Sequence, residues 1–322
     1  MPKVALLFPG QGAQYPRMAA GLYEHYEPFT AIMDRAFESL GRAGDGLRAA
    51  WLSDGPTEPF DDVTHAQPLL YAIDYALGSL MLSWGAEPVA LLGHSVGEMA
   101  AATLAGVFGF PDGMRLMRDR VEQFANTPVG GMLAVAASAA DVEPHLIGQV
   151  AVAAVNAPRQ ILVAGPRREL AEVERTLREK RFTCKAVRAR QGFHSPVVDA
   201  AAARSVDAWR SVGLSRPRRR VYSSQLGAVL PPHLAVDPLF WARQPAVTVW
   251  FWEALGLMLD EHEELILVEA GPGQGLSAIA RRHPAVRSGQ SRVVPLLPAR
   301  PGPPQADREA VRRAAAQIGA AG

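Results

Sequence analysis

The feature that most constrains this chain is the pentapeptide Gly93-His94-Ser95-Val96-Gly97, which fits the pattern G-x-S-x-G. An apolar run, Pro88–Leu92, leads into it, and Met99–Leu104 follows with the composition of a helix. Glycines two positions before and two after a serine permit a sharp, strained turn between a strand and a helix. The turn exposes the hydroxyl where the helix N-terminus favours negative charge. The pattern therefore predicts an α/β fold with Ser95 as its nucleophile.

The flanking sequence is typical of an α/β domain that is interrupted by a smaller unit. Val4–Phe8 predicts a buried first strand, and Gln67–Trp84 and Asp112–Phe124 predict helices. The pattern then changes to β-α-β-β-α-β, which is typical of a ferredoxin-like subdomain. Its predicted strands are Gly131–Ala136, Val150–Val155, Gln160–Ala164 and Thr183–Val187, and its predicted helices are Val142–Gly148 and Arg168–Lys180.

Strand signals resume beyond this unit at Arg220–Ser223 and Glu264–Glu269. We therefore predict a discontinuous large domain with a parallel sheet, α/β-hydrolase-like, over residues 1–126 and 197–322. The small ferredoxin-like subdomain is inserted over residues 127–196. The tail from Ala299 is rich in Pro, Ala and Arg, and its pattern is compatible with a final helix or with a linker.

Charge and composition narrow the function classes. Lys and Arg number 33 and Asp and Glu 32, so the net charge of +1 predicts neither nucleic-acid nor membrane-surface binding. The single cysteine, Cys184, excludes an intramolecular disulfide and a cysteine-rich metal site, and we predict no bound metal. No apolar run reaches the ~18 residues that a membrane span needs. We expect a cytoplasmic monomer.

A serine hydroxyl is a weak nucleophile and needs a base. The chain has eight histidines. The pattern of the sequence by itself leaves three of them as candidates for the base, namely His194, His262 and His283.

Four motifs occur in a fixed order: Phe8-Pro9-Gly10-Gln11-Gly12, Gly93-His94-Ser95-Val96-Gly97-Glu98, Gly192-Phe193-His194-Ser195-Pro196 and Val268-Glu269-Ala270-Gly271-Pro272. Together they resemble the malonyl-CoA:acyl carrier protein transacylases and the acyltransferase domains of polyketide synthases. The resemblance extends from Phe8 to about Leu297. The fold of that family, an α/β-hydrolase-like core with an inserted ferredoxin-like subdomain, agrees with the organisation predicted above.

The resemblance implies a role for each matching residue. Ser95 would attack a thioester carbonyl, and His194 would take its proton and later activate the incoming thiol. The backbone N–H groups of Gln11 and Val96 would hold the oxyanion. In the family a main-chain carbonyl orients the histidine, and the matching residue here is Gln244, so no acidic third residue is required.

The resemblance also bears on the acyl group. Arg120 follows Ser95 by 25 residues, where members that use malonyl or methylmalonyl groups carry an arginine that pairs with the free carboxylate. Phe193 and the apolar Val96 favour malonyl, and Gln67 and Asn156 match positions near the pocket. Two departures, Gln191-Gly192 before Phe193 and Thr248 where the family has proline, leave the acyl group open.

The expected substrates carry CoA or phosphopantetheine, and the expected partner is an acyl carrier protein; no bound cofactor is implied. Arginines of the small subdomain are candidates for docking an acidic carrier, notably Arg159, Arg167 and Arg188.

Four functions remain open at this point. A transferase could load malonyl from CoA, or could move another acyl group, such as an aminoacyl group, between two carriers. A hydrolase could edit wrong acyl groups or act as an esterase, although esterases of this kind place the histidine late, which would favour His262 or His283. A docking scaffold without catalysis would have little need for Ser95 and His194.

Overall fold

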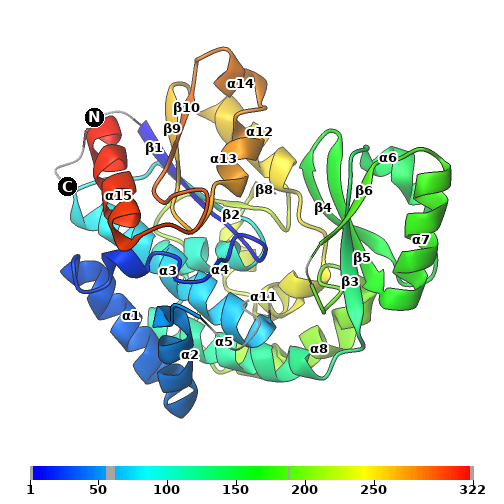
Figure 1. Cartoon of the computed structure of the whole chain (residues 1–322), viewed down its shortest axis with the longest axis horizontal. Coiled ribbons are helices and arrows are strands. Elements are labelled where there is room, and N and C mark those ends of the chain that lie inside the picture. The colour runs from blue at the N-terminus through cyan, green and yellow to red at the C-terminus, as the bar shows by residue number, and fades with distance from the viewer. Residues whose placement is uncertain (1–2, 56–61, 188, 320–322) are drawn as a thin grey trace.

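A computed structural model describes residues 3–55, 62–187 and 189–319 and contains two separate sheets (Figure 1). The larger sheet has the strand order β10-β9-β1-β2-β7-β8, and its pairs are parallel except for β7 with β8. Its strands are β1 (Lys3–Phe8), β2 (Ala90–Gly93), β7 (Val221–Ser223), β8 (Ala228–Val229), β9 (Leu265–Glu269) and β10 (Arg292–Pro295).

The strand β1 is central because both of its faces are apolar. Successive side chains of a strand point to opposite faces, so Leu6 and Phe8 enter one core and Ala5 and Leu7 enter another. The first core is covered by helices that include α3 (Val63–Ser83), α4 (Val96–Leu104) and α5 (Phe110–Ala125), and the second by α12 (Phe251–Glu261) and α13 (Gly275–Ala280). The large domain therefore has helices on both sides of a mostly parallel sheet.

The helices of this domain are α1 (Glu27–Leu40), α2 (Arg42–Leu52), α3 (Val63–Ser83), α4 (Val96–Leu104), α5 (Phe110–Ala125), α8 (Asp199–Arg204), α9 (Val206–Arg210), α10 (Pro232–Ala235), α11 (Pro238–Arg243), α12 (Phe251–Glu261), α13 (Gly275–Ala280), α14 (Pro284–Arg287) and α15 (Pro304–Ile318). Short 3₁₀ turns add η1 (Ala20–Leu22), η3 (Pro196–Val198) and η4 (Gln244–Ala246). The helices α1 and α2 lie in a stretch for which the sequence pattern predicted no element.

The smaller sheet stands beside the larger one, at the right of Figure 1, and is antiparallel throughout. Its order, β4-β5-β3-β6, together with a chain order of β-α-β-β-α-β, gives the predicted ferredoxin-like pattern. Its elements are β3 (Gly130–Val135), α6 (Ala139–Val142), η2 (Glu143–His145), β4 (Ala151–Ala157), β5 (Gln160–Pro166), α7 (Arg167–Glu179) and β6 (Cys184–Val187). The predicted α/β fold class is confirmed.

One predicted helix was misplaced. We expected a helix over Val142–Gly148, but helical structure begins at Ala139 and ends in the 3₁₀ turn at His145. The early start has a cause in the sequence, because Ser138 and Asp141 form a reciprocal capping box. Pro144 lacks the N–H that a continuing helix needs, so the helix does not extend to Gly148.

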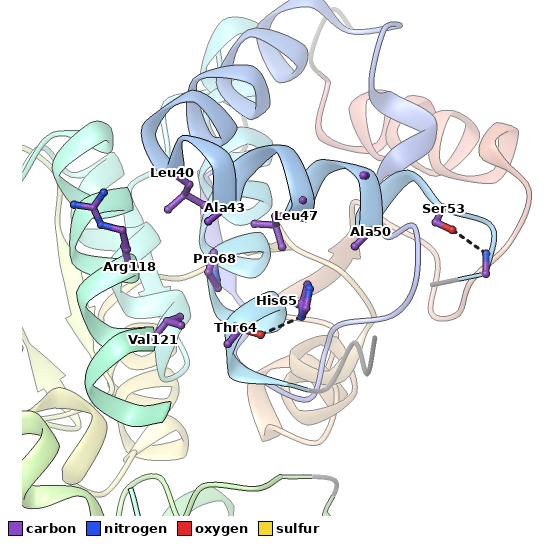
Figure 2. Close-up of a pocket in the computed structure, with 13 residues that line it drawn as sticks. Leu40, Ala43, Leu47, Ala50, Ser53, Thr64, His65, Pro68, Arg118 and Val121 are labelled. Carbon is purple, nitrogen blue, oxygen red and sulfur yellow. Dashed lines mark hydrogen bonds between the residues drawn. The ribbon is translucent and has the colours of Figure 1, made fainter. Parts of the chain in front are cut away.

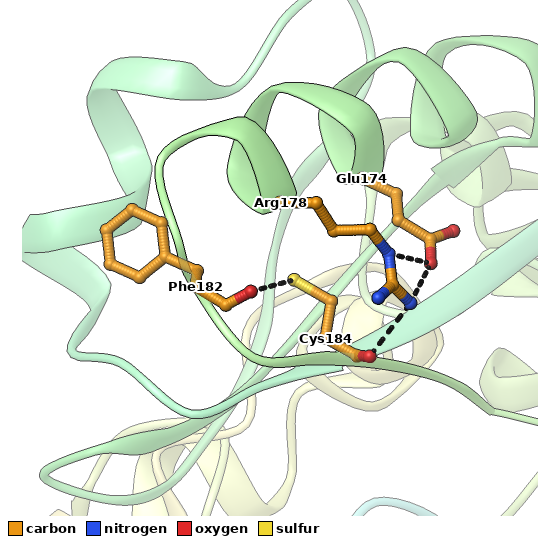
Figure 3. Close-up of polar contacts among 4 residues, drawn as sticks. All are labelled: Glu174, Arg178, Phe182 and Cys184. Atoms are coloured by element: carbon orange, nitrogen blue, oxygen red, sulfur yellow. Dashed lines mark hydrogen bonds and ion pairs between the residues drawn. The ribbon is translucent and has the colours of Figure 1, made fainter.

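The lone cysteine lies in this small subdomain and is packed rather than reactive. Cys184 is buried at the start of β6, and burial raises the pKa of its thiol. Figure 3 shows how Arg178 on α7 donates to Glu174 and to the carbonyl of Cys184 at 3.0 Å, while the thiol faces the carbonyl of Phe182. Arg178 therefore fastens α7 to the edge strand β6.

The tail that the sequence left undecided contains a packed helix. Val311 on α15 is fully buried, and Asp307 accepts a hydrogen bond from the backbone N–H of Gly21 at 3.0 Å. Within the three described ranges, no helix combines the length and the apolar character required to cross a bilayer.

Candidate active site

Three of the four sequence motifs meet at one edge of the large sheet because its strands are parallel and in register. Phe8 at the end of β1 pairs with Gly93 at the end of β2, and Leu7 pairs with Glu269 at the end of β9. The residues that follow these strands therefore emerge side by side at the carboxyl edge, where open α/β sheets bind ligands. Ser95 is two residues beyond β2.

Ser95 has the backbone conformation that the pentapeptide predicted. Its φ of 53° and ψ of −121° are strained for a residue with a side chain, and it directly precedes α4. The two glycines are required by close packing. A Cβ at Gly93 would stand 2.1 Å from the backbone nitrogen of Glu98, and one at Gly97 would stand 2.2 Å from the carbonyl oxygen of Phe8. The turn can therefore form only with glycine at both positions.

His194 is the histidine that the fold brings to the serine. Its Nε2 lies 2.7 Å from Ser95 Oγ, and its Nδ1 lies 2.7 Å from the carbonyl oxygen of Val247. A carbonyl can only accept, so Nδ1 carries the proton and donates to it, and the unprotonated Nε2 accepts from the serine hydroxyl. His262 and His283 make other contacts: His262 packs against Tyr222, and His283 caps α14.

The orienting carbonyl was assigned to the wrong residue. The resemblance pointed to the main chain of Gln244, whereas the hydrogen bond at 2.7 Å is made by Val247. The carbonyl of Gln244 contributes only the weakest of the effects on the histidine pKa. The 3₁₀ turn η4 explains the difference, because it follows directly after α11 and carries the chain past Gln244 before it extends at Val247.

Burial keeps the candidate base neutral. The pKa of His194 is lowered to about 3, chiefly by desolvation and also by His94 and the positive charge of Arg120, which together outweigh the favourable bond to Val247. An imidazole with such a pKa is unprotonated at neutral pH. It can therefore accept the serine proton throughout the physiological range.

The sequence-predicted Gln11 and Gln67 lie together beside the elbow. The side-chain amide of Gln67 on α3 donates to Oε1 of Gln11 at 3.2 Å, and Gln67 is buried. Gln11 lines the same small cavity as Ser95, and Val96 is the first residue of α4. The first turn of a helix has backbone N–H groups without intrahelical partners, which suit a developing oxyanion.

Arg120 and Gln244 form a pair that connects α5 to the elbow. Arg120 is 5% exposed, and desolvation lowers its pKa to about 10. Its Nη2 donates to Oε1 of Gln244 at 3.2 Å, and Nε2 of Gln244 donates to the carbonyl oxygen of Ser95 at 2.7 Å. Among residues 3–55, 62–187 and 189–319, no carboxylate forms an ion pair with Arg120. The side chain of Gln244 thus has a position that sequence reasoning missed.

Asn156 joins the small subdomain to the catalytic turn. Its Oδ1 lies 2.8 Å from Nε2 of His94, the residue before the nucleophile. The ring of His94 packs against Phe251, and burial lowers its pKa, which favours the neutral ring. The backbone pairing of Ala154 with Val249 makes a second connection between the two parts. The sequence placed Asn156 near the cleft. No role was assigned to its partner His94, although that residue lies within the Gly93-His94-Ser95 motif and could have been noticed there.

The space beside Ser95 is narrow and mostly apolar. A cavity of about 40 Å³ borders Ser95 and His194, and a wider groove of about 380 Å³ shares Gln11 and His94 with it. Phe193 forms one wall, and its ring packs on Phe124 with centroids 5.2 Å apart. The remaining walls are largely small-subdomain side chains, including Met132, Ala154, Leu162 and Val187.

The three arginines singled out for carrier docking do not form one described cluster. Arg159 lies in the turn before β5 and pairs with Asp141 at 3.7 Å, whereas Arg167 begins α7 at the other end of β5. The seven residues of β5 lie between them, so the two positions are eight residue steps, or about 26 Å, apart along the strand. Arg188 lies outside the described residues.

A separate cavity of about 600 Å³ opens between α2, the start of α3 and α5 (Figure 2). Leu47 and Ala50 of α2 face Pro68 and Val121 across it, and His65 bonds to Thr64 at its end. It shares no lining residue with the space beside Ser95. Among the described residues, no group of three or more His, Cys, Asp or Glu side chains is arranged to hold a metal ion.

A serine on a strained turn before a helix, with a neutral histidine at 2.7 Å, is the arrangement that serine enzymes of acyl chemistry use. Comparison with known proteins gives the family. Residues 5–317 match the model of the acyl transferase domain. The chain belongs to this acyltransferase family.

The relatives agree. Over 283 residues the chain is 34% identical to a protein of the phenolphthiocerol/phthiocerol polyketide synthase of Mycobacterium tuberculosis, covering 88% of this chain and 19% of that protein. The chain thus spans about a fifth of that relative's length. The acyl transferase domain of SpnD, solved with 2-(pent-4-yn-1-yl)malonyl, is 31% identical with a TM-score of 0.90 and covers 100% of this chain and 77% of that one. The malonyl CoA-acyl carrier protein transacylase of Coxiella burnetii (22%, TM-score 0.83, 97% and 98% covered) shares the fold.

Proposed function

We propose that the protein moves a malonyl group from CoA through a Ser95 ester to the phosphopantetheine thiol of an acyl carrier protein in polyketide or fatty-acid biosynthesis. Membership of the acyltransferase family supports the reaction type. The names of its relatives, a polyketide synthase and a malonyl transacylase, support the pathway class and the partner.

The observation that carries the malonyl assignment is Arg120. An arginine that is 5% exposed and has no carboxylate partner among the described residues keeps unused charge-assisted donors in a desolvated place. It lies close enough to His194 to lower the histidine pKa and is connected to the backbone of Ser95 through Gln244. A free carboxylate on the acyl group would complete the ion pair. A neutral acyl group would leave the guanidinium unpaired.

The first half-reaction makes the acyl-enzyme. Ser95 Oγ forms a bond to the thioester carbonyl carbon while its proton passes to Nε2 of His194. The negative charge that develops on the carbonyl oxygen is held by the backbone N–H groups of Gln11 and Val96. The carbon–sulfur bond then breaks, and the CoA sulfur leaves with the proton from His194.

The second half-reaction reverses these steps with a new thiol. His194 removes the proton of the phosphopantetheine thiol, the thiolate attacks the serine ester, and Ser95 regains its proton. Transfer has to outrun hydrolysis. The apolar lining of the narrow space beside Ser95, with Leu162 and Phe193, supports transfer because it disfavours water near the ester. The wider groove at Gln11 and His94 offers a path for the thioester arm.

The test is intact-protein mass spectrometry after incubation with malonyl-CoA or acetyl-CoA. We expect a malonyl adduct on the wild-type protein, no adduct on Ser95→Ala, and a much reduced malonyl adduct on Arg120→Ala. Arg115→Ala is the matched control, because Arg115 lies on the same helix but is exposed and pairs with Asp112. An equal acetyl adduct would refute the malonyl assignment, and acylation of Ser95 by carrier-bound donors alone would favour transfer between two carriers.

A further inference from the structure

Four consecutive residues, Gln244 to Val247, reach the nucleophile, the base and the buried arginine of the proposed reaction. The carbonyl of Pro245 accepts from the backbone N–H of His194 at 2.7 Å, and the carbonyl of Val247 accepts from its ring. The side chain of Gln244 contacts both Ser95 and Arg120. The backbone of this segment therefore fixes the position of His194. The side chain of Gln244 contacts other partners and has a separate role.

The two partners of Gln244 determine how its amide must lie. The carbonyl oxygen of Ser95 can only accept, so the NH₂ group faces it, and the guanidinium of Arg120 can only donate, so the amide oxygen faces Arg120. Of the side chains of this length, only glutamine offers a donor to one partner and an acceptor to the other without adding charge. Glutamate would lose the donor and form an ion pair with Arg120, and methionine would lose both bonds.

Burial makes this bond the one that directs the arginine. Gln244 is 2% exposed and Arg120 is 5% exposed, so bulk water does not compete for either group. A guanidinium has five N–H donors in a rigid plane, and holding one of them at Nη2 restricts the direction of the others. Without that bond the long side chain of Arg120 would regain several rotamers. Substrate binding would then have to order it, and this entropy loss would weaken the binding of the substrate.

We propose that the side chain of Gln244 is a positioning residue that fixes Arg120 relative to Ser95 and thereby selects acyl groups that carry a free carboxylate. The inference rests on the proposed function, because it needs an acyl group with a carboxylate. Its effect falls on the binding of carboxyacyl donors. A purely structural role of Gln244, through the carbonyl of Ser95, would instead slow acylation by every donor equally.

The experiment compares the ratio of kcat/KM for malonyl-CoA to that for acetyl-CoA in Ser95 acylation. We expect Gln244→Met to lower this ratio about 10-fold, mainly through KM for malonyl-CoA, and Gln244→Glu to lower it further because the new carboxylate occupies Arg120. The matched control is Gln225→Met. Like Gln244, Gln225 is a glutamine that donates to a main-chain carbonyl, in its case that of Phe240, although it is only partly buried. Its substitution should leave the ratio unchanged.

A double-mutant cycle tests whether Gln244 acts on the donor preference through Arg120. In an Arg120→Met background, adding Gln244→Met should leave the ratio unchanged, because the residue acts through the arginine. Equal losses for both donors, or a further fall of the ratio in that background, would overturn the inference. A wild-type protein without an Arg120-dependent preference for malonyl-CoA would overturn the proposed function itself, and the inference with it. Unfolding of each variant by circular dichroism shows whether it is folded at the assay temperature.

Discussion

Desolvation of His194 has a measurable consequence for the pH dependence of acylation. The base acts in its unprotonated form, so a pKa lowered to about 3 extends the active range toward acid pH. At pH 5 about 99% of such an imidazole is neutral. A histidine with the ordinary pKa of about 6.5 would be only about 3% neutral there, against about 76% at pH 7. The rate of Ser95 acylation should therefore change little between pH 7 and pH 5, where a solvated histidine would lose about 25-fold.

The assay is rapid-quench acylation of the enzyme by its preferred CoA thioester at saturating donor, read by intact mass from pH 5 to pH 8. Of the groups that face His194, Arg120 keeps its charge throughout this window, since its pKa is about 10, and burial lowers the pKa of His94. Glu98 does titrate there, because burial raises its pKa to about 7.

Running Glu98→Gln in parallel separates the two effects. A step near pH 7 that disappears in this variant belongs to Glu98. A fall of about 25-fold with a midpoint near 6.5 in both proteins would show that His194 is solvated, and the reasoning from its burial would be refuted.

Three further predictions concern stability and docking. Gly97→Ala should destabilise the fold by more than about 3 kcal/mol in thermal unfolding, because the new Cβ would meet the carbonyl oxygen of Phe8 at 2.2 Å. The control Gly46→Ala should be neutral or stabilising, because open space surrounds that position in α2. The contribution of Glu98 to the free energy of unfolding should fall by up to about 3 kcal/mol as pH rises from 4.5 to 7, because folded Glu98 holds its proton to a pKa of about 7. In denaturant titrations Glu98→Gln should remove that contribution and leave that of Glu269, whose pKa burial also raises to about 7. Arg159→Glu should raise KM for the carrier protein and leave acylation by CoA unchanged; an unchanged KM would remove Arg159 from the docking surface.

The catalytic turn could be predicted from sequence because its determinants are local. Two glycines, an apolar strand and a helix specify the conformation of Ser95 within about ten residues. The β-α-β-β-α-β pattern was likewise visible, since each element carries its own periodicity. The misplaced helix shows the limit of periodicity. The capping box at Ser138 was present in the sequence and marks the true start, but the apolar spacing was followed instead.

Contacts between distant segments were harder to predict. The orienting carbonyl was placed at Gln244 by resemblance, and the structure gives Val247, three residues later. Nothing in a linear sequence reports where a 3₁₀ turn such as η4 ends, because that depends on how the segment packs against the loop of His194. A shift of three residues exchanges one carbonyl for another without changing any motif. The motif is therefore recognised correctly although the residue assigned to supply the carbonyl is not the one that contacts His194.

The same shift explains why Gln244 matters in a way that a main-chain role would not. A carbonyl partner constrains no side chain, so any residue would serve at that position. Because Val247 supplies the carbonyl, only the side-chain hydrogen bonds of Gln244 to Ser95 and Arg120 explain why this position is a glutamine. Substitution there should therefore alter which donors are accepted while His194 keeps both of its main-chain contacts. If Gln244→Met instead abolished acylation by all donors, the main function of this segment would be to hold His194 and not to select the donor.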